Sequence, residues 1–374
     1  MQMLRGDRAK YLSLVMAVAF STFLMSHQSS SFVGIMNRTR SQILDVQDAP
    51  IWVMDPKTQY FDEVKGLPDD VLYRVRGVEG VEWAVPLYKG QPIARAGDGN
   101  FRSVILMGVD DQSLAGAPRR LLAGSIADLR QPDAVLMDRA AYAFFFPDQP
   151  LEIGKIFEMN DRTIKVAGIF DSSAPFNNLP VFYARYSNAI HYRGQERNML
   201  SFVLVKAKNG VTDQEVCRRI EAATGLHAAT KRGFGWQTIN YYMKHSGIPI
   251  NFGITIAIGL LVGILVAGQT LYIFTIENLK QFSVLKAVGV TDWRIVRMIL
   301  LQAMTVGVIG YSIGISMTTA FFEITKESID LRGFFLPWQI ASGTAAAVLL
   351  IVMLASLMSI RRVLVLEPAV VFRG

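Results

Sequence analysis

Charged side chains are absent from four long stretches of the chain, and each stretch is rich in apolar residues. These stretches run between residues 11 and 37, 248 and 276, 298 and 322, and 333 and 360. A helix needs roughly 20 residues to cross a hydrocarbon core of about 30 Å. The pattern therefore predicts four transmembrane helices, at residues 11–36, 248–276, 298–322 and 334–360.

The first of these stretches also has features of a cleaved secretory signal peptide. Arg5, Arg8 and Lys10 precede an apolar core, and a serine run follows at residues 29–31. We favour an uncleaved helix, because an even number of spans leaves both termini on the same side of the membrane.

Basic residues gather on one side of the predicted spans. They lie in residues 1–10, 277–297 and 361–374, whereas the two basic residues of the 323–333 loop are offset by three acidic ones. Segments rich in lysine and arginine remain in the cytoplasm. We therefore expect both termini and residues 277–297 to be cytoplasmic, and residues 37–247 and 323–333 to lie outside.

The long segment at residues 37–247 has the pattern of a mixed α+β domain, inserted between the first and second transmembrane helices. Helical spacing continues beyond residue 36, which predicts a stalk that leads out of the membrane. Short apolar runs predict strands at 51–54, 83–96, 101–109, 134–137, 156–159, 163–169 and 201–207, and helices at 71–76, 139–146, 212–223 and 236–245.

Local sequence signals support parts of this assignment. Gly97 to Asn100 and Asn160-Asp161 are favoured hairpin turns. Thr212 and Glu215 have the spacing of a capping box at a helix start. The apolar run Ala143 to Phe146 fits either a lipid or partner contact or the buried end of a short helix, and we favour the buried helix end.

The chain has few residues or motifs of the kinds used for catalysis, metal binding or nucleotide binding. The single cysteine, Cys217, excludes a disulfide within the chain and is best interpreted as a small buried side chain. The histidines are isolated, and no G-x-x-x-x-G-K-[ST] loop is present to hold a nucleotide phosphate. We therefore expect neither an enzyme nor a metal or cofactor site in this chain. The net charge of +7 reflects the cytoplasmic segments and does not require nucleic-acid binding.

Two small-residue motifs occur in the second and third predicted spans. Gly259 and Gly263 form one G-x-x-x-G motif, and Gly310 and Gly314 form another. Small residues four positions apart allow helix backbones to approach closely in lipid. These glycines predict helix packing, either within the chain or against a second copy.

Residues 277–297 predict a short amphipathic helix between two membrane spans. Phe282, Leu285, Val288 and Gly289 form its interior and its end, and charged residues lie at its edges. A cytoplasmic partner that pushed such a helix would move both neighbouring spans.

The sequence of this segment, ENLKQFSVLKAVGVTDWRIV, resembles the cytoplasmic loop of FtsX-like permeases, the membrane subunits of MacB-type ABC transporters. Those loops commonly read E-R-x-x-E-I-G-I-L-K-A-L-G. The chain also ends with Arg361-Arg362, a Pro368-Ala369 pair and Arg373, which is similar to the closing motif of the family. Segments 77–82, 86–88, 103–109 and 135–140 are most similar to the DevC subgroup.

The resemblance implies that the chain is the permease subunit of an exporter in the bacterial inner membrane. ATP and Mg²⁺ would be bound by a separate ABC ATPase. The permease would work as a dimer, most simply a homodimer. The assembly would also contain a periplasmic adaptor (a membrane fusion protein) and an outer-membrane channel. The substrate would be lipid-like or amphipathic. The implied ATPase-coupling residues are Glu277, Lys280, Gln281, Phe282, Leu285, Lys286, Ala287, Val288 and Gly289. Gln281 departs from the family pattern, which has a carboxylate there, so a salt bridge to the ATPase at that point is in doubt.

Three other functions fit parts of the pattern. An FtsX-type protein would transmit force to a cell-wall hydrolase, and a lipoprotein-release permease would share the same architecture. A receptor would need a cytoplasmic output domain, which a tail at 361–374 is too short to form.

Overall fold

The computed structural model describes residues 8–96, 99–192, 200–326, 328 and 331–365. The chain divides into two compact units, one made of residues 1–34 and 247–374 and the other of residues 35–246. The first two residues of the predicted turn at 97–100 and the closing motif at 366–373 lie outside the described residues.

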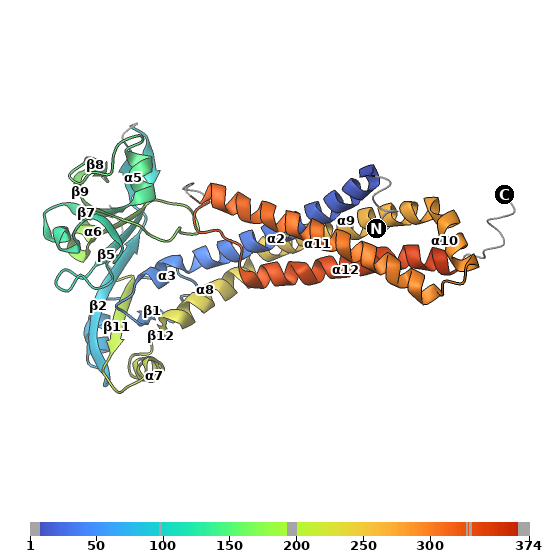
Figure 1. Ribbon diagram of the computed structural model, residues 1–374. Helices are drawn as coiled ribbons and strands as arrows, with labels where there is room; N and C mark the ends of the chain where they lie inside the picture. Colours follow the sequence, from blue (N-terminus) through green and yellow to red (C-terminus); the bar gives the residue numbers. More distant parts are fainter. Residues whose placement is uncertain (1–7, 97–98, 193–199, 327, 329–330, 366–374) are drawn as a thin grey trace. The chain divides into compact units, whose positions relative to one another are not determined.

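The first unit is helical (Figure 1). Its long helices are α2 (Arg8–Thr39), α9 (Ile248–Glu277), α11 (Asp292–Thr325) and α12 (Trp338–Leu364), with the short α10 (Leu279–Ala287) between α9 and α11. Among the described residues, four helices are long and apolar enough to span a membrane, as predicted. α11 begins at Asp292 rather than at 298, because charged residues at the end of a membrane helix remain helical where they meet water.

An apolar core holds these helices together. It joins the N-terminal half of α2 to α9, α11 and α12 through Val18, Leu271, Val306, Ile351 and Val352. Polar side chains are also buried within the bundle, since the hydroxyls of Ser26 and Thr318 hydrogen-bond to each other at 2.6 Å. Hydroxyl pairs of this kind satisfy polar groups where no water is available.

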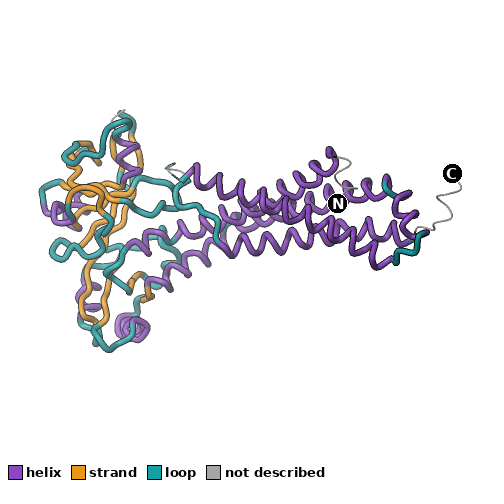
Figure 2. Tube along the Cα trace, in the orientation of Figure 1, coloured by secondary structure: helices purple, strands orange, loops and turns teal. Residues whose placement is uncertain are grey.

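The second unit contains all the described strands, which are orange in Figure 2. Its strands are β1 (Ile51–Met54), β2 (Val81–Gly90), β3 (Ile93–Arg95), β4 (Phe101–Ser103), β5 (Ile105–Val109), β6 (Leu121–Gly124), β7 (Ala134–Asp138), β8 (Ile156–Met159), β9 (Arg162–Phe170), β10 (Val181–Arg185), β11 (Phe202–Ala207) and β12 (His227–Thr230). They follow the order β12-β1-β11-β2-β5-β10-β7-β9-β8-β3-β4, and β6 pairs with β9. The pairs β5–β10 and β7–β9 are parallel, and the remaining pairs are antiparallel.

Short helices surround these strands. They are α3 (Ser41–Asp45), α4 (Asp70–Arg76), η1 (Ile126–Arg130), α5 (Arg139–Phe145), α6 (Tyr186–Tyr192), α7 (Asp213–Thr224) and α8 (Lys231–His245). The mixed α+β character predicted for this segment is therefore confirmed.

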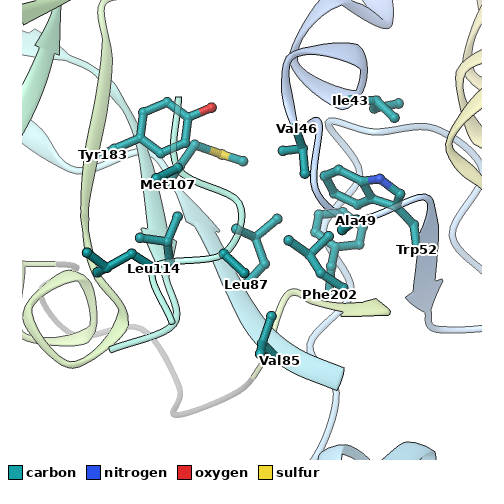
Figure 3. Close-up of a cluster of buried hydrophobic side chains, with 14 of the residues drawn as sticks. Ile43, Val46, Ala49, Trp52, Val85, Leu87, Met107, Leu114, Tyr183 and Phe202 are labelled. Carbon is teal, nitrogen blue, oxygen red and sulfur yellow. The ribbon is translucent and has the colours of Figure 1, made fainter. Parts of the chain in front are cut away.

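β1 is buried on both faces, which explains why all four of its residues are apolar. Ile51 and Val53 face a core beneath α4 and α7, and that core also contains Cys217. Trp52 and Met54 face a second core, in which Trp52 and Phe202 pack edge to face with ring centroids 5.4 Å apart. Figure 3 shows Trp52, Leu87 and Phe202 converging in this second core.

The sequence predicted one strand at 83–96 and one at 101–109. Both predictions are wrong in this respect, because each segment forms two strands separated by a break. The break between β2 and β3 falls at Gln91-Pro92, and proline has no N–H to contribute to a strand ladder. The break between β4 and β5 falls at Val104, whose N–H donates to the carbonyl of Pro92 at 3.0 Å. β3 and β4 thereby form their own hairpin, with Arg95 opposite Phe101.

The structure contains the predicted hairpin turn at Asn160-Asp161 and part of the predicted helix cap at Thr212. Asn160 and Asp161 both have positive φ, 45° and 60°, so the predicted hairpin turn is confirmed. The Thr212 hydroxyl accepts a hydrogen bond from the Glu215 N–H at 3.3 Å, as a cap should. The Glu215 carboxylate instead contacts Arg218 and Arg219, so it does not complete the capping box in the way predicted.

The apolar run Ala143 to Phe146 is half buried, so the favoured interpretation holds for its last two residues and not for Ala143 and Phe144. Phe145 is fully buried and Phe146 nearly so. Phe144 remains 40% exposed, and the guanidinium of Arg102 lies 5.0 Å from the centre of its ring.

Candidate functional site

α10 ends at a glycine that the backbone requires. Gly289 has φ +94°, its N–H donates to the Lys286 carbonyl, and the Val290 N–H donates to the Leu285 carbonyl, both at 3.0 Å. This pair of bonds is the Schellman motif, which favours glycine at the left-handed position. The motif turns the chain sharply from α10 into α11. We call the segment from Leu279 to Arg297 the helical corner.

The inner face of the helical corner is fixed to two membrane helices. Phe282 is 1% exposed and packs with Ile295 and Ile299 of α11 and Val363 of α12. Leu285 is partly buried against the same cluster. These contacts oppose rotation of α10 relative to its neighbours.

Polar contacts reinforce this attachment. The Lys286 ammonium lies 2.9 Å from the Asp292 carboxylate and 3.3 Å from the carbonyl of Leu364, and only 11% of the lysine side chain is exposed. Glu277, at the end of α9, forms an ion pair with Lys10 of α2. The helical corner is thus connected to α11 and α12 directly, and through the end of α9 to α2.

The outer face of the helical corner is exposed and has a mixed basic and apolar surface. Val284 is 47% exposed, Val288 79% and Trp293 73%. Lys280 and Arg294 are also exposed. Val284 and Val288 are four positions apart, so they lie on one side of the helix, and exposed apolar side chains in such a place are candidates for contact with a partner.

The residues implied for ATPase coupling divide between the two faces. Phe282, Leu285 and Lys286 point into the fold, and Glu277 is in an ion pair. The exposed members are Glu277, Lys280, Gln281, Ala287, Val288 and Gly289. Trp293 is exposed as well, and the sequence analysis did not single it out, because an exposed and a buried tryptophan look alike in a sequence.

The four motif glycines all face α2. A methyl group added at Gly259 or Gly310 would meet Leu24 and Met25 or Val18. One added at Gly314 would lie 2.5 Å from the Ala19 carbonyl oxygen. One at Gly263 would lie 2.7 Å from Ile351 of α12 as well as 2.8 Å from the Ser21 hydroxyl of α2. Both motifs therefore pack within the chain, where they allow α9 and α11 to approach α2 closely.

The α+β domain contains no group of metal-binding side chains among its described residues. His227 contacts Glu221 at 2.8 Å and Gln237 at 3.0 Å through its two ring nitrogens. Burial raises the pKa of the Cys217 thiol to about 12, and Glu221 and Asp213 contribute in the same direction. A thiol with a raised pKa is a poor nucleophile near neutral pH.

Two family models match the chain in adjacent segments. The MacB-like periplasmic core domain matches residues 15–223, and the FtsX-like permease C-terminal model matches residues 253–368. The second match contains the whole helical corner, and the first contains most of the α+β domain.

Curated relatives of the chain are ABC transporter permeases. An uncharacterized ABC transporter permease of Mycobacterium tuberculosis is 22% identical over 311 residues, covering 82% of this chain and 79% of the relative. One from Mycobacterium bovis is 26% identical over 147 residues, covering 37% of this chain and 41% of the relative. Among solved structures, the periplasmic region of MacB from Actinobacillus actinomycetemcomitans aligns with a TM-score of 0.39 and 14% identity, covering 55% of this chain and 96% of that one. The chain belongs to the ABC transporter permeases of the FtsX/MacB type.

Proposed function

We propose that this permease is driven by a separate ABC ATPase, which binds the outer face of the helical corner in the cytoplasm. The observation that supports the proposal is the division of the corner into two faces. The inner face is attached to α11 and α12 through Phe282 and Lys286, whereas the outer face leaves Val288 and Trp293 exposed. One face is suited to receive a partner and the other to pass on its movement.

The proposed orientation follows from the basic residues. Lys280, Arg294 and Arg297 lie on the helical corner, and Arg361 and Arg362 lie at the end of α12. These residues lie on the cytoplasmic side according to the positive-inside rule. The α+β domain then lies in the periplasm, between the first and second spans.

Movement of the corner would reach the rest of the bundle through defined contacts. Phe282 carries it to α11 and α12, and the Glu277–Lys10 pair carries it to α2. The close contacts that the glycines of α9 and α11 make with α2 provide a second connection to that helix. Coupling of this kind requires that the ATPase bind the corner differently in its two nucleotide states.

The proposed contact with the ATPase is mainly apolar and basic. Gln281 is exposed and uncharged, so it supplies hydrogen bonds but no charge. Lys280 and Arg294 provide positive charge on the same surface. An ATPase surface with an apolar pocket and acidic residues around it would fit.

The proposed output is export of a lipid-like or amphipathic substrate. Two permease copies would work with a periplasmic adaptor and an outer-membrane channel, and ATP and Mg²⁺ would remain on the ATPase. Assignment to the DevC subgroup rests on segments 77–82, 86–88, 103–109 and 135–140, most of which lie in buried strands.

The experiment that tests ATPase binding uses Trp293→Glu in the full chain. The matched control is Ile324→Glu, since Ile324 is 81% exposed at the other end of α11. We expect Trp293→Glu to reduce ATPase co-purification and stimulated ATP hydrolysis by about 30-fold, the loss typical of an interface hot spot. Ile324→Glu should retain both. Equal behaviour of the two variants would count against the proposal.

The same coupling device would serve a permease that acts on a cell-wall hydrolase. The proteins recovered with the periplasmic domain distinguish the two outputs. Recovery of an adaptor supports export, and recovery of a hydrolase without an adaptor would replace export with force transmission.

A further inference from the structure

β4 is the last strand in the order of the α+β domain, and all three of its residues are exposed. Phe101 is 68% exposed, which is high for an aromatic side chain. β4 pairs with β3 on one side, and no described strand pairs with its other side.

The hydrogen bonds of the hairpin show which backbone groups of β4 face outward. The Ala96 N–H donates to the Asn100 carbonyl at 2.9 Å, and the Val104 N–H donates to the Pro92 carbonyl at 3.0 Å. Hydrogen-bonded positions alternate in an antiparallel pair. Arg102, opposite Ala94, is therefore the residue of β4 that bonds to β3. The N–H and C=O groups of Phe101 and Ser103 point away from β3.

Side chains on both faces of this edge are suited to a partner. Ile93 and Ile156 are 49% and 64% exposed and lie on the same face of the sheet as Phe101. A hollow of about 250 Å³ on this face is lined by Ile93, Arg95, Phe101, Glu158, Asn160 and Asp161. On the opposite face Arg102 lies over the ring of Phe144.

We propose that β4 pairs with an extended strand of another protein, which adds itself to the edge of the sheet. The incoming strand would place an apolar side chain beside Phe101 and an acidic side chain beside Arg102. Strand addition supplies main-chain hydrogen bonds, and alternate side chains supply specificity. The inference rests on the proposed export function for the identity of the partner, which is the periplasmic adaptor.

A second copy of the permease is a poor occupant of this edge. β4 is centred on Arg102, so two copies related by a two-fold axis would pair Arg102 with Arg102. Like charges directly opposite each other destabilise a strand pair. Lipid is unsuitable as well, because hydrocarbon cannot satisfy the outward N–H and C=O groups.

Ser103→Pro is the decisive variant, because it removes an outward N–H without removing a bond to β3. Proline is tolerated in an edge strand when its N–H side faces solvent. Ser103→Ala is the matched control, since it keeps the N–H and removes the hydroxyl. A second variant, Phe101→Glu, places an acid where the proposed partner has an apolar side chain.

The readout is photocrosslinking in the host bacterium, with p-benzoylphenylalanine at position 93 of the full-length permease. The control position is Tyr73, which is 71% exposed on α4. We expect a crosslink from position 93, and not from 73, to a protein that mass spectrometry identifies as the adaptor. Ser103→Pro and Phe101→Glu should lower its yield at least about fivefold, the effect of one lost hydrogen bond, whereas Ser103→Ala should not.

Several outcomes would overturn the inference. They are the absence of an adduct at position 93, an equal yield from position 73, an adduct to a second permease, and an undiminished yield with Ser103→Pro. The proposed function is tested separately, because ATP hydrolysis stimulated through Trp293 does not depend on β4. A failure at β4 with normal Trp293 results would reject the strand pairing alone.

Discussion

Lys286 and Asp292 form an ion pair of 2.9 Å across the turn that joins α10 to α11. The same ammonium group donates to the carbonyl of Leu364 at the end of α12. A single side chain therefore connects three helices at the corner where the ATPase is proposed to bind. This connection, and the apolar cluster around Phe282, distinguish residues that transmit movement from residues that contact the partner.

The first prediction separates transmission from binding. Lys286→Met should leave ATPase co-purification intact, because the outer face is unchanged, and should lower stimulated ATP hydrolysis about 3- to 10-fold. Lys286→Arg keeps the charge and should lose less. Hydrolysis assays on the purified complex check this, and wild-type rates with Lys286→Met would show that the ion pair has no role in transmission.

The second prediction concerns the packing of the corner. Phe282→Ala should destabilise the folded permease by about 3–5 kcal/mol, since it opens a cavity in a closed cluster. Val288→Ala, at a site 79% exposed, should change stability by less than about 0.5 kcal/mol. Thermal unfolding of both variants in the same detergent measures the difference, and similar midpoints would mean that Phe282 is not packed as described.

The third prediction tests the glycine contacts. Gly314→Ala would place a methyl group 2.5 Å from the Ala19 carbonyl oxygen, so α11 must move away from α2 at a cost of about 1–3 kcal/mol. Gly343→Ala is the matched control, because Gly343 lies in α12 with no atom within 4 Å of an added methyl. It should be neutral or slightly stabilising. If both substitutions lower the unfolding temperature equally, α11 does not approach α2 at Gly314 as closely as described.

The fourth prediction follows from Cys217. Its pKa is raised from 9.0 to about 12 in the folded protein, so the thiol keeps its proton there after the unfolded chain has lost it. The folded state binds more protons between about pH 9 and 12, so stability should fall as pH rises, by at most about 1.4 kcal/mol per pH unit.

Two measurements check this thiol prediction. Cys217→Ala should reduce the fall in stability between pH 9 and pH 10 relative to the unmodified chain. Iodoacetamide should modify Cys217 slowly in the folded protein at pH 8 and much faster after unfolding. Rapid labelling of the folded protein would contradict the burial of this thiol.

The sequence predicted the membrane architecture well because hydrocarbon imposes a simple rule. Charged side chains are excluded from it, so the four stretches without charge correspond to α2, α9, α11 and α12. The helix ends were less predictable, since Asp292 is both charged and helical. The α+β domain obeys no such rule, and β6, β10 and β12 were missed. β6 and β12 are poor in the β-branched and aromatic residues typical of strands, whereas β10 contains them and could have been predicted.

The site could be predicted only in part. An amphipathic pattern and a terminal glycine predicted α10 and its end, and both are present. Which residues face outward depends on how α11 and α12 pack against the helix. Leu285 turns inward, so a charge there would disrupt the corner itself, and Trp293 is the better probe of partner binding.

We have proposed that an ATPase binds the outer face of the helical corner and that the contact changes with nucleotide. The most direct measurement uses Val288→Cys in a Cys217→Ala background, labelled with a benzophenone maleimide, in the complex purified with its ATPase. Ile324→Cys is the control. We expect an adduct with the ATPase from position 288 alone, with a yield that differs between nucleotide-free and vanadate-trapped complexes. Equal yields in the two states, or no adduct at 288, would contradict it.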